Sequence, residues 1–180
     1  KSKGIWRDIK ILWFLDKYFE KTGLKGIYIL LATQIPQGRP HELIEHMVKE
    51  YSWPFNHRIG WPDLVGYEID IYQLIEKFNQ NSKNIKAIFI NQYGLSKRKC
   101  GIDFPEDITT RDLKLASDVE FGLSIYEPFG ISHIEVLPSG GLSLLSTSCG
   151  VFYLLEKIFK EDFKPYIAID FIDIGKDLPE

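Results

Sequence analysis

Short apolar segments alternate with segments of helical period along the whole chain, and this alternation constrains the fold more than any other feature. The segments that predict strands are residues 26–32, 85–90, 118–124, 142–146 and 166–172. The segments that predict helices are residues 5–19, 41–50, 69–78, 111–117, 131–138 and 151–160. Strands that alternate with helices favour a parallel sheet with helices on its faces. We therefore expect an α/β fold, a Rossmann-like three-layer α/β/α sandwich, with its ligand beyond the carboxyl ends of the strands. The run at 26–32 carries no charge, which is typical of a strand buried on both faces.

Composition narrows the class of protein. With 180 residues, 44% apolar and 26% charged, the chain is long enough for one domain with a full core. A net charge of −3 gives no general attraction for nucleic acid or anionic lipid, and no apolar run is long enough to insert into a membrane. The two cysteines, Cys100 and Cys149, predict no disulfide framework, so a reducing cytoplasm is expected. The chain begins with Lys1 rather than Met, which indicates a fragment or a processed chain.

The stretch from residue 124 to residue 141 is the strongest candidate for a functional site. It follows a predicted strand and places Glu127 in a turn and Glu135 eight residues later, inside a predicted helix. A strand-to-helix junction presents free backbone N–H groups and the positive end of a helix dipole, which favour an anion. Gly130 leaves room for a ligand against the backbone. Carboxylates beside an anion site predict a ligand with hydroxyls and phosphates, and a nucleotide sugar is such a ligand.

This stretch resembles the E-x7-E signature of the retaining glycosyltransferases with the GT-B fold, which include the glycogen and starch synthases and sucrose synthase. The resemblance is carried by Tyr126-Glu-Pro-Phe-Gly130, Glu135, Ser139-Gly140, Ser146 and Cys149-Gly150. Lys3-Gly4 and Asp118-Val119 resemble two further pairs of that family, whereas residues 33–105 match little beyond the order of strands. The resemblance implies that the chain is one half of a GT-B fold, the C-terminal, donor-binding domain.

The resemblance also implies a role for each matching residue. Glu127 is expected to contact the hydroxyls of the donor sugar or to stabilise the positive charge that develops at its anomeric carbon. Glu135 is expected to accept hydrogen bonds from the ribose, and Lys3 to neutralise the diphosphate leaving group. Such cations replace a metal ion in this family, so neither a metal nor a cofactor is expected. The backbone N–H groups of Phe129, Gly130, Ile131 and Ser132 are expected to hold sugar oxygens and the diphosphate. Gly140 and Gly141 are expected to leave space at the start of the neighbouring loop.

The expected function is binding of a nucleoside diphosphate sugar and transfer of a hexose, with retention of configuration, to a carbohydrate acceptor. The likeness to glycogen synthases makes glucose the expected sugar. The family places the acceptor on an N-terminal domain of the same protein and an Arg shortly before Lys3; this chain contains neither, so the isolated domain is expected to be nearly inactive. Two alternatives stay open: a non-catalytic nucleotide-sugar-binding or regulatory module, and an unrelated α/β fold whose two glutamates pair by accident.

Other candidates carry less weight. His133 is interpreted as a structural histidine, and Cys149 as a packed cysteine because no histidine lies close to it in sequence. The basic run at 97–99 and the Trp-rich loop at 51–66, with His57, are interpreted as solvated or groove-filling segments. The four His and two Cys show no spacing typical of a zinc site.

Overall fold

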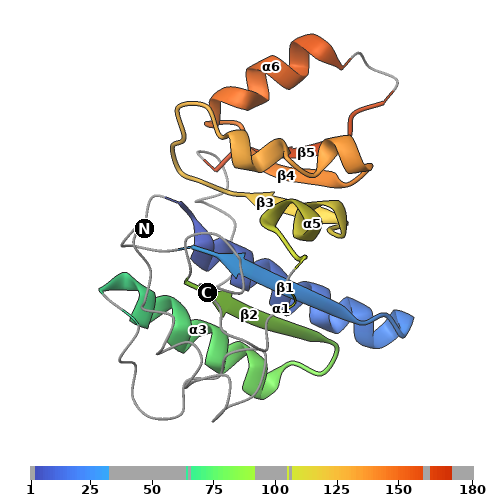
Figure 1. Ribbon diagram of the computed structural model, residues 1–180. Coiled ribbons are helices and arrows are strands. Elements are labelled where there is room, and N and C mark those ends of the chain that lie inside the picture. Colours follow the sequence, from blue (N-terminus) through green and yellow to red (C-terminus); the bar gives the residue numbers. More distant parts are fainter. Residues whose placement is uncertain are drawn as a thin grey trace. The chain divides into compact units, whose positions relative to one another are not determined.

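A computed structural model describes residues 3–32, 64, 66–91, 105, 107–159 and 163–171 of the chain. Within these ranges the protein consists of α-helices and parallel β-strands, so the predicted α/β class is confirmed (Figure 1). Three predictions lie wholly or mostly outside the described residues: the helix at 41–50, the loop at 51–66 with His57, of which only residues 64 and 66 are described, and the basic run at 97–99 with the neighbouring Cys100.

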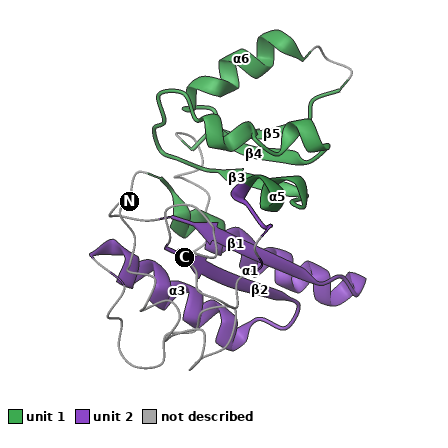
Figure 2. Cartoon of the chain, in the orientation of Figure 1, with its two compact units in different colours: residues 1–8, 111–180 green, residues 9–110 purple. Residues whose placement is uncertain are grey.

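The chain divides into two compact units, each with its own sheet (Figure 2). Unit 1 contains residues 1–8 and 111–180, and unit 2 contains residues 9–110. Helix α1, Ile5–Thr22, begins in unit 1 and continues in unit 2. The sequence predicts one continuous sheet, whereas the described strands form a pair in unit 2 and a group of three in unit 1.

The described part of unit 2 is built on two parallel strands and the helices beside them in sequence. Strand β1, Gly26–Leu31, pairs with β2, Ile85–Ile90, residue for residue along their length. Helix α3, Tyr67–Asn81, buries Tyr72, Ile75 and Phe78, which recur every third residue along one face. Phe78 packs edge to face against Trp13 of α1, with 5.2 Å between the ring centroids.

The prediction that residues 26–32 are buried on both faces is wrong. Tyr28 and Leu30 are buried, but Ile27 is 68% exposed and Ile29 is 39% exposed. The strand therefore alternates between a covered and an uncovered face, as in a sheet packed on one side.

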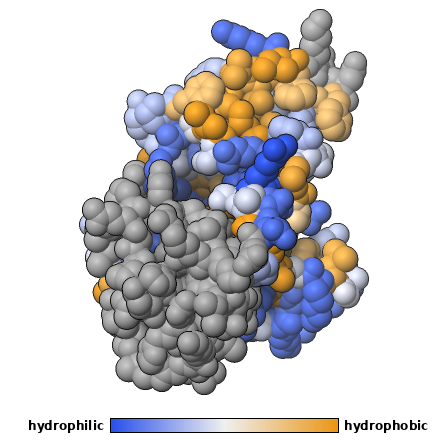
Figure 3. Space-filling view, viewed as in Figure 1, coloured by the Kyte–Doolittle hydropathy of each residue, from blue (hydrophilic) through white to orange (hydrophobic). Residues whose placement is uncertain are grey.

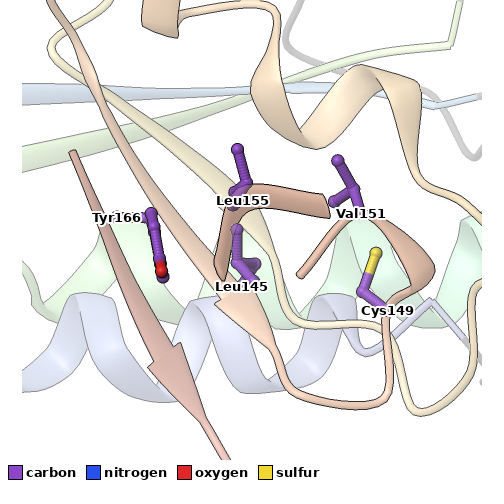
Figure 4. Close-up of a cluster of buried hydrophobic side chains, with 5 residues drawn as sticks. All are labelled: Leu145, Cys149, Val151, Leu155 and Tyr166. Carbon is purple, nitrogen blue, oxygen red and sulfur yellow. The ribbon is translucent and has the colours of Figure 1, made fainter. Parts of the chain in front are cut away.

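Among its described residues, unit 1 contains three parallel strands in the order β3-β4-β5. Their bounds are Val119–Gly122, Leu142–Ser146 and Tyr166–Ile169. Helix α5, Thr110–Leu115, precedes β3, and α6, Gly150–Ile158, follows β4. The core between α6 and the sheet consists of Leu145, Cys149, Val151, Leu155 and Tyr166, shown in Figure 4. The outer face of α6 carries exposed apolar side chains, and apolar atoms gather over it in Figure 3.

The predicted helix at 131–138 is wrong, because the segment forms two short 3-10 turns. These are η1, Ile131–Ile134, and η2, Leu137–Ser139. The carbonyl oxygen of His133 accepts a bond of 2.6 Å from the Ser143 hydroxyl, and Pro138 has no N–H to donate. Gly140 then ends η2 in the left-handed conformation, with φ of 84°. A single turn aligns few peptide dipoles, so this segment lacks the macrodipole that we expected to favour an anion.

Candidate functional site

Lys3 and Glu127 form an ion pair although 124 residues separate them in the sequence. The Lys3 ammonium donates to Oε2 of Glu127. The Lys3 side chain is 64% exposed, whereas that of Glu127 is only 17% exposed. The structure therefore brings together the two residues to which the resemblance assigns catalytic roles, with the lysine on the solvent side.

The start of the chain is held against the end of β3, and this places Lys3. Gly4 is buried with φ of 72°, and a Cβ on it would overlap the carbonyl oxygen of Leu123. Arg7 donates to the same carbonyl at 3.1 Å, and its guanidinium carbon lies 3.8 Å from the ring centroid of Phe171. Only glycine satisfies both the positive φ and the close approach at residue 4. The pair Lys3-Gly4 thus works as a unit, because the glycine lets the lysine reach Glu127.

The turn that carries Glu127 is bonded to the first turn of α6. Gly150 N–H donates to the Glu127 carbonyl at 3.0 Å, and Val151 N–H donates to the Phe129 carbonyl at 2.7 Å. A Cβ on Gly150 would overlap the Pro128 carbonyl, so this close approach also requires glycine. The first amides of α6 are therefore satisfied by the turn itself. By contrast, the backbone N–H groups of residues 129–132 donate to no acceptor among the described residues.

His133 and Cys149 meet beneath this turn. Nδ1 of His133 lies 3.2 Å from Sγ of Cys149, and that thiol donates to the Phe129 carbonyl at 3.0 Å. The pKa of His133 is lowered, mainly by burial. The Glu127 carboxylate opposes this shift, whereas the charges of Lys3 and Lys114 add to it. Burial likewise raises the pKa of the fully buried Cys149 thiol. A neutral imidazole bonded to a protonated thiol is a structural contact, not an activated nucleophile.

Sequence reasoning missed the contact of His133 with Cys149, since it considered only histidines close to the cysteine in sequence. The two residues are 16 positions apart, and no spacing rule connects a 3-10 turn with the residue that precedes α6. Gly122 offers an indirect signal, because a Cβ there would overlap the His133 ring. A glycine inside a strand often marks such a close approach.

The glycines of the motif serve different purposes. A Cβ on Gly130, at φ of 89°, would lie 2.5 Å from Sγ of Cys149 and 2.8 Å from the His133 ring. A Cβ on Gly141 would overlap Val136. Gly140 faces open space, so its positive φ alone requires glycine. Gly130 and Gly141 are therefore needed by internal packing, a role that the sequence did not predict.

Glu135 is paired with a lysine that sequence reasoning also missed. Nζ of Lys114 lies 3.6 Å from Oε2 of Glu135 and also donates to Glu120. The Glu135 side chain is 46% exposed, so its carboxylate can accept a bond from a ligand. The charges of Glu127, Lys3 and Lys114 all influence the pKa of His133.

The rest of unit 1 offers few other polar clusters among the residues described. Glu156 of α6 pairs with Lys164 at 2.8 Å and accepts a bond from the Tyr166 hydroxyl. In the part of the chain that the structure describes, no three His, Cys, Asp or Glu side chains gather as metal ligands. None of the helices within these ranges has the length and apolar character needed to cross a bilayer.

The chain matches no model of a known protein family, and no curated protein matches it. The geometry of the motif residues is therefore the basis for assigning a function.

Proposed function

We propose that this chain is the donor-binding half of a retaining hexosyltransferase with the GT-B fold. In this proposal it adopts a Rossmann-like α/β/α sandwich, binds a nucleoside diphosphate sugar and transfers glucose to a carbohydrate acceptor. An N-terminal domain of the same protein supplies the acceptor site, and the protein acts in the cytoplasm. The observation that carries the proposal is the ion pair between Lys3 and Glu127, since the resemblance assigns a catalytic role to each of these two residues.

The chemistry of this pair suits the transfer. A leaving nucleoside diphosphate gains negative charge as the glycosidic bond breaks, and an ammonium group lowers the energy of that charge. Lys3 is mostly exposed and held by a single carboxylate, so it can exchange this partner for a phosphate. Glu127 is less exposed and its turn is bonded to α6, so its carboxylate stays in place to face the developing positive charge of the sugar.

The other motif residues complete the proposed donor site. The N–H groups of Phe129, Gly130, Ile131 and Ser132 hold sugar oxygens and the diphosphate, and they donate to no acceptor in bonds between described residues. Glu135 accepts hydrogen bonds from the ribose hydroxyls. Gly140 and Gly141 shape the neighbouring loop. Lys3 supplies the positive charge for the diphosphate, so the proposal requires no metal and no cofactor.

Calorimetric titration of the 180-residue chain with UDP, ADP and GDP tests the proposal. We expect one nucleotide to bind saturably, and Lys3→Met to weaken its binding about tenfold or more, because a charged hydrogen bond contributes about 1.5–3 kcal/mol. Lys164→Met is the matched control, since it removes an exposed lysine of another ion pair in the same unit. It is expected to leave the affinity unchanged. If none of the three nucleotides binds at millimolar concentration, the proposal is wrong.

Activity distinguishes the transferase from a non-catalytic binding module. In the complete protein, we expect Glu127→Gln to reduce kcat for glucosyl transfer at least a hundredfold while nucleotide affinity changes little. A complete protein that binds the nucleotide sugar and neither transfers nor hydrolyses it would favour the module.

A further inference from the structure

Lys114 lies between two carboxylates that belong to different elements. It sits near the end of α5, where it donates to Glu120 of β3 and faces Oε2 of Glu135 at 3.6 Å. Lys114 and Glu120 are mostly buried, with side chains 18% and 16% exposed, whereas that of Glu135 is 46% exposed. The cluster thus has an inner pair and one outer carboxylate.

The inner pair is fixed by the backbone around it. Glu120 lies within β3 and is paired in register with Ser143 of β4. The carbonyl of Lys114 accepts a bond of 3.2 Å from the N–H of Ser117, which closes the end of α5. The backbones of Glu120 and Lys114 are therefore held by the sheet and by the helix end. Glu135, by comparison, follows the single turn of η1.

Lys114 supplies the positive charge that offsets the repulsion between the carboxylates of Glu120 and Glu135. Burial raises the pKa of Glu120, and the charge of Glu135 raises it further, whereas the bond and charge of Lys114 lower it. Without the lysine, two neighbouring carboxylates would repel each other, and one of them would take up a proton or turn away. With it, the carboxylate of Glu135 faces a cation at 3.6 Å.

We propose that Lys114 is a positioning residue that, held in place by Glu120, directs the carboxylate of Glu135 towards the vicinal hydroxyls of a bound ribose. This inference rests on the proposed function, because it deepens the role of Glu135 in nucleotide binding. A pair of adjacent hydroxyls donates two hydrogen bonds to one carboxylate, and each is stronger when the carboxylate is ionised. A carboxylate free to rotate would have to be ordered at the moment of binding, which reduces affinity.

Comparison of ribonucleotides with their 2′,3′-dideoxy counterparts tests this inference, with the nucleoside diphosphate that binds best among UDP, ADP and GDP. We expect the unchanged chain to prefer the ribonucleotide about tenfold or more. Lys114→Met is expected to remove this preference by weakening the ribonucleotide alone, and Lys114→Arg to restore most of it. Glu120→Gln is expected to reduce the preference in part. If Lys114→Met keeps the preference, the inference is wrong.

A second measurement separates this inference from the proposed function. Side-chain NMR couplings can report the rotamers of Glu135 without any ligand, in the unchanged chain and in both Lys114 variants. We expect Glu135 to lose its preferred rotamer in Lys114→Met and to regain it in Lys114→Arg, since Nζ of Lys114 lies 3.6 Å from its carboxylate. This loss of order without nucleotide binding in the unchanged chain would overturn the proposed function and, with it, the ribose contact, while the control of Glu135 by Lys114 would stand. An unchanged rotamer distribution, with intact circular dichroism, would overturn the positioning role itself.

Discussion

Asp16 in unit 2 and Glu127 in unit 1 are both poorly exposed carboxylates, but they are satisfied by different kinds of partner. Asp16 accepts bonds of 2.7–3.2 Å from the backbone N–H groups of residues 83–85, where β2 begins. Burial alone would raise the pKa of Asp16, but these donors and the charge of Lys25 outweigh it, so its pKa is lowered. The Glu127 carboxylate instead accepts a bond from the exposed Lys3.

The difference separates a structural carboxylate from one suited to a ligand. Backbone donors cannot leave without unfolding the turn, so Asp16 fixes how α1 and β2 are joined in unit 2. An exposed lysine can move away at low cost, because a solvated ion pair contributes about 0–1 kcal/mol. Asp16 is therefore expected to control stability, and Glu127 to act on a bound ligand.

The largest effect is expected for Asp16→Ala. It leaves the N–H groups of residues 83–85 without their acceptor, and we expect the free energy of unfolding to fall by about 3 kcal/mol in urea titrations at pH 7. Glu20→Gln is the control, one helical turn away, since Glu20 pairs at 3.0 Å with the exposed side chain of Lys83. It should change stability by less than about 0.5 kcal/mol. If Asp16→Ala and Glu20→Gln lower the free energy of unfolding equally, the distinction between carboxylates with backbone partners and those with lysine partners is wrong.

The two ends of α1 provide the next test. Gly4 and Gly23 share a φ of 72°, but a Cβ on Gly4 would overlap the Leu123 carbonyl, whereas nothing lies within 4 Å of one on Gly23. Gly23→Ala is expected to cost about 1 kcal/mol for its backbone conformation alone. Gly4→Ala is expected to cost about 2 kcal/mol or more and to separate Lys3 from Glu127, which the loss of nucleotide affinity would report. If the two variants lower stability by similar amounts and Gly4→Ala leaves nucleotide affinity unchanged, Gly4 does not place Lys3 beside Glu127.

The smallest expected effect is a difference between the two units in how their stability depends on pH. The pKa of His133 is lowered by burial, so its contribution to stability is complete above the unfolded pKa of 6.5 and is lost as the pH falls through the folded pKa. The loss is at most about 1.4 kcal/mol for each pH unit. Asp16, with a lowered pKa, keeps its contribution until the pH falls below 3.8.

Hydrogen exchange at pH 7.5 and 5.5 can separate these contributions. We expect the protection of Leu145 and Val151 in unit 1 to decrease at the lower pH, and that of Ala87 and Phe89 in unit 2 to stay the same after correction for intrinsic exchange rates. His133→Gln should remove the decrease in unit 1. A decrease of equal size in both units, or one that persists in His133→Gln, would contradict the role given to this histidine.

The sequence by itself determined most of the described helices and strands. The strands at 85–90 and 142–146 have the predicted bounds, and α1 begins at Ile5 as predicted and ends three residues beyond the predicted range, at Thr22 before Gly23. These elements follow from apolar periodicity and from glycine, which act over a few neighbouring residues. The same rules were wrong for residues 131–138, which form two 3-10 turns; Pro138 there has no N–H to donate, and the His133 carbonyl accepts a bond from the distant Ser143 hydroxyl.

The sequence also selected Lys3, Glu127 and Glu135 through a motif, but only the tertiary structure decided what each of them contacts. The pairing of Lys3 with Glu127, the bond between His133 and Cys149, and the link from Lys114 to Glu135 join segments that are distant along the chain. Such contacts depend on the register of strands and on the direction of side chains after packing. Periodicity contains neither, which is why Lys114 and the role of Cys149 became visible only in the folded chain.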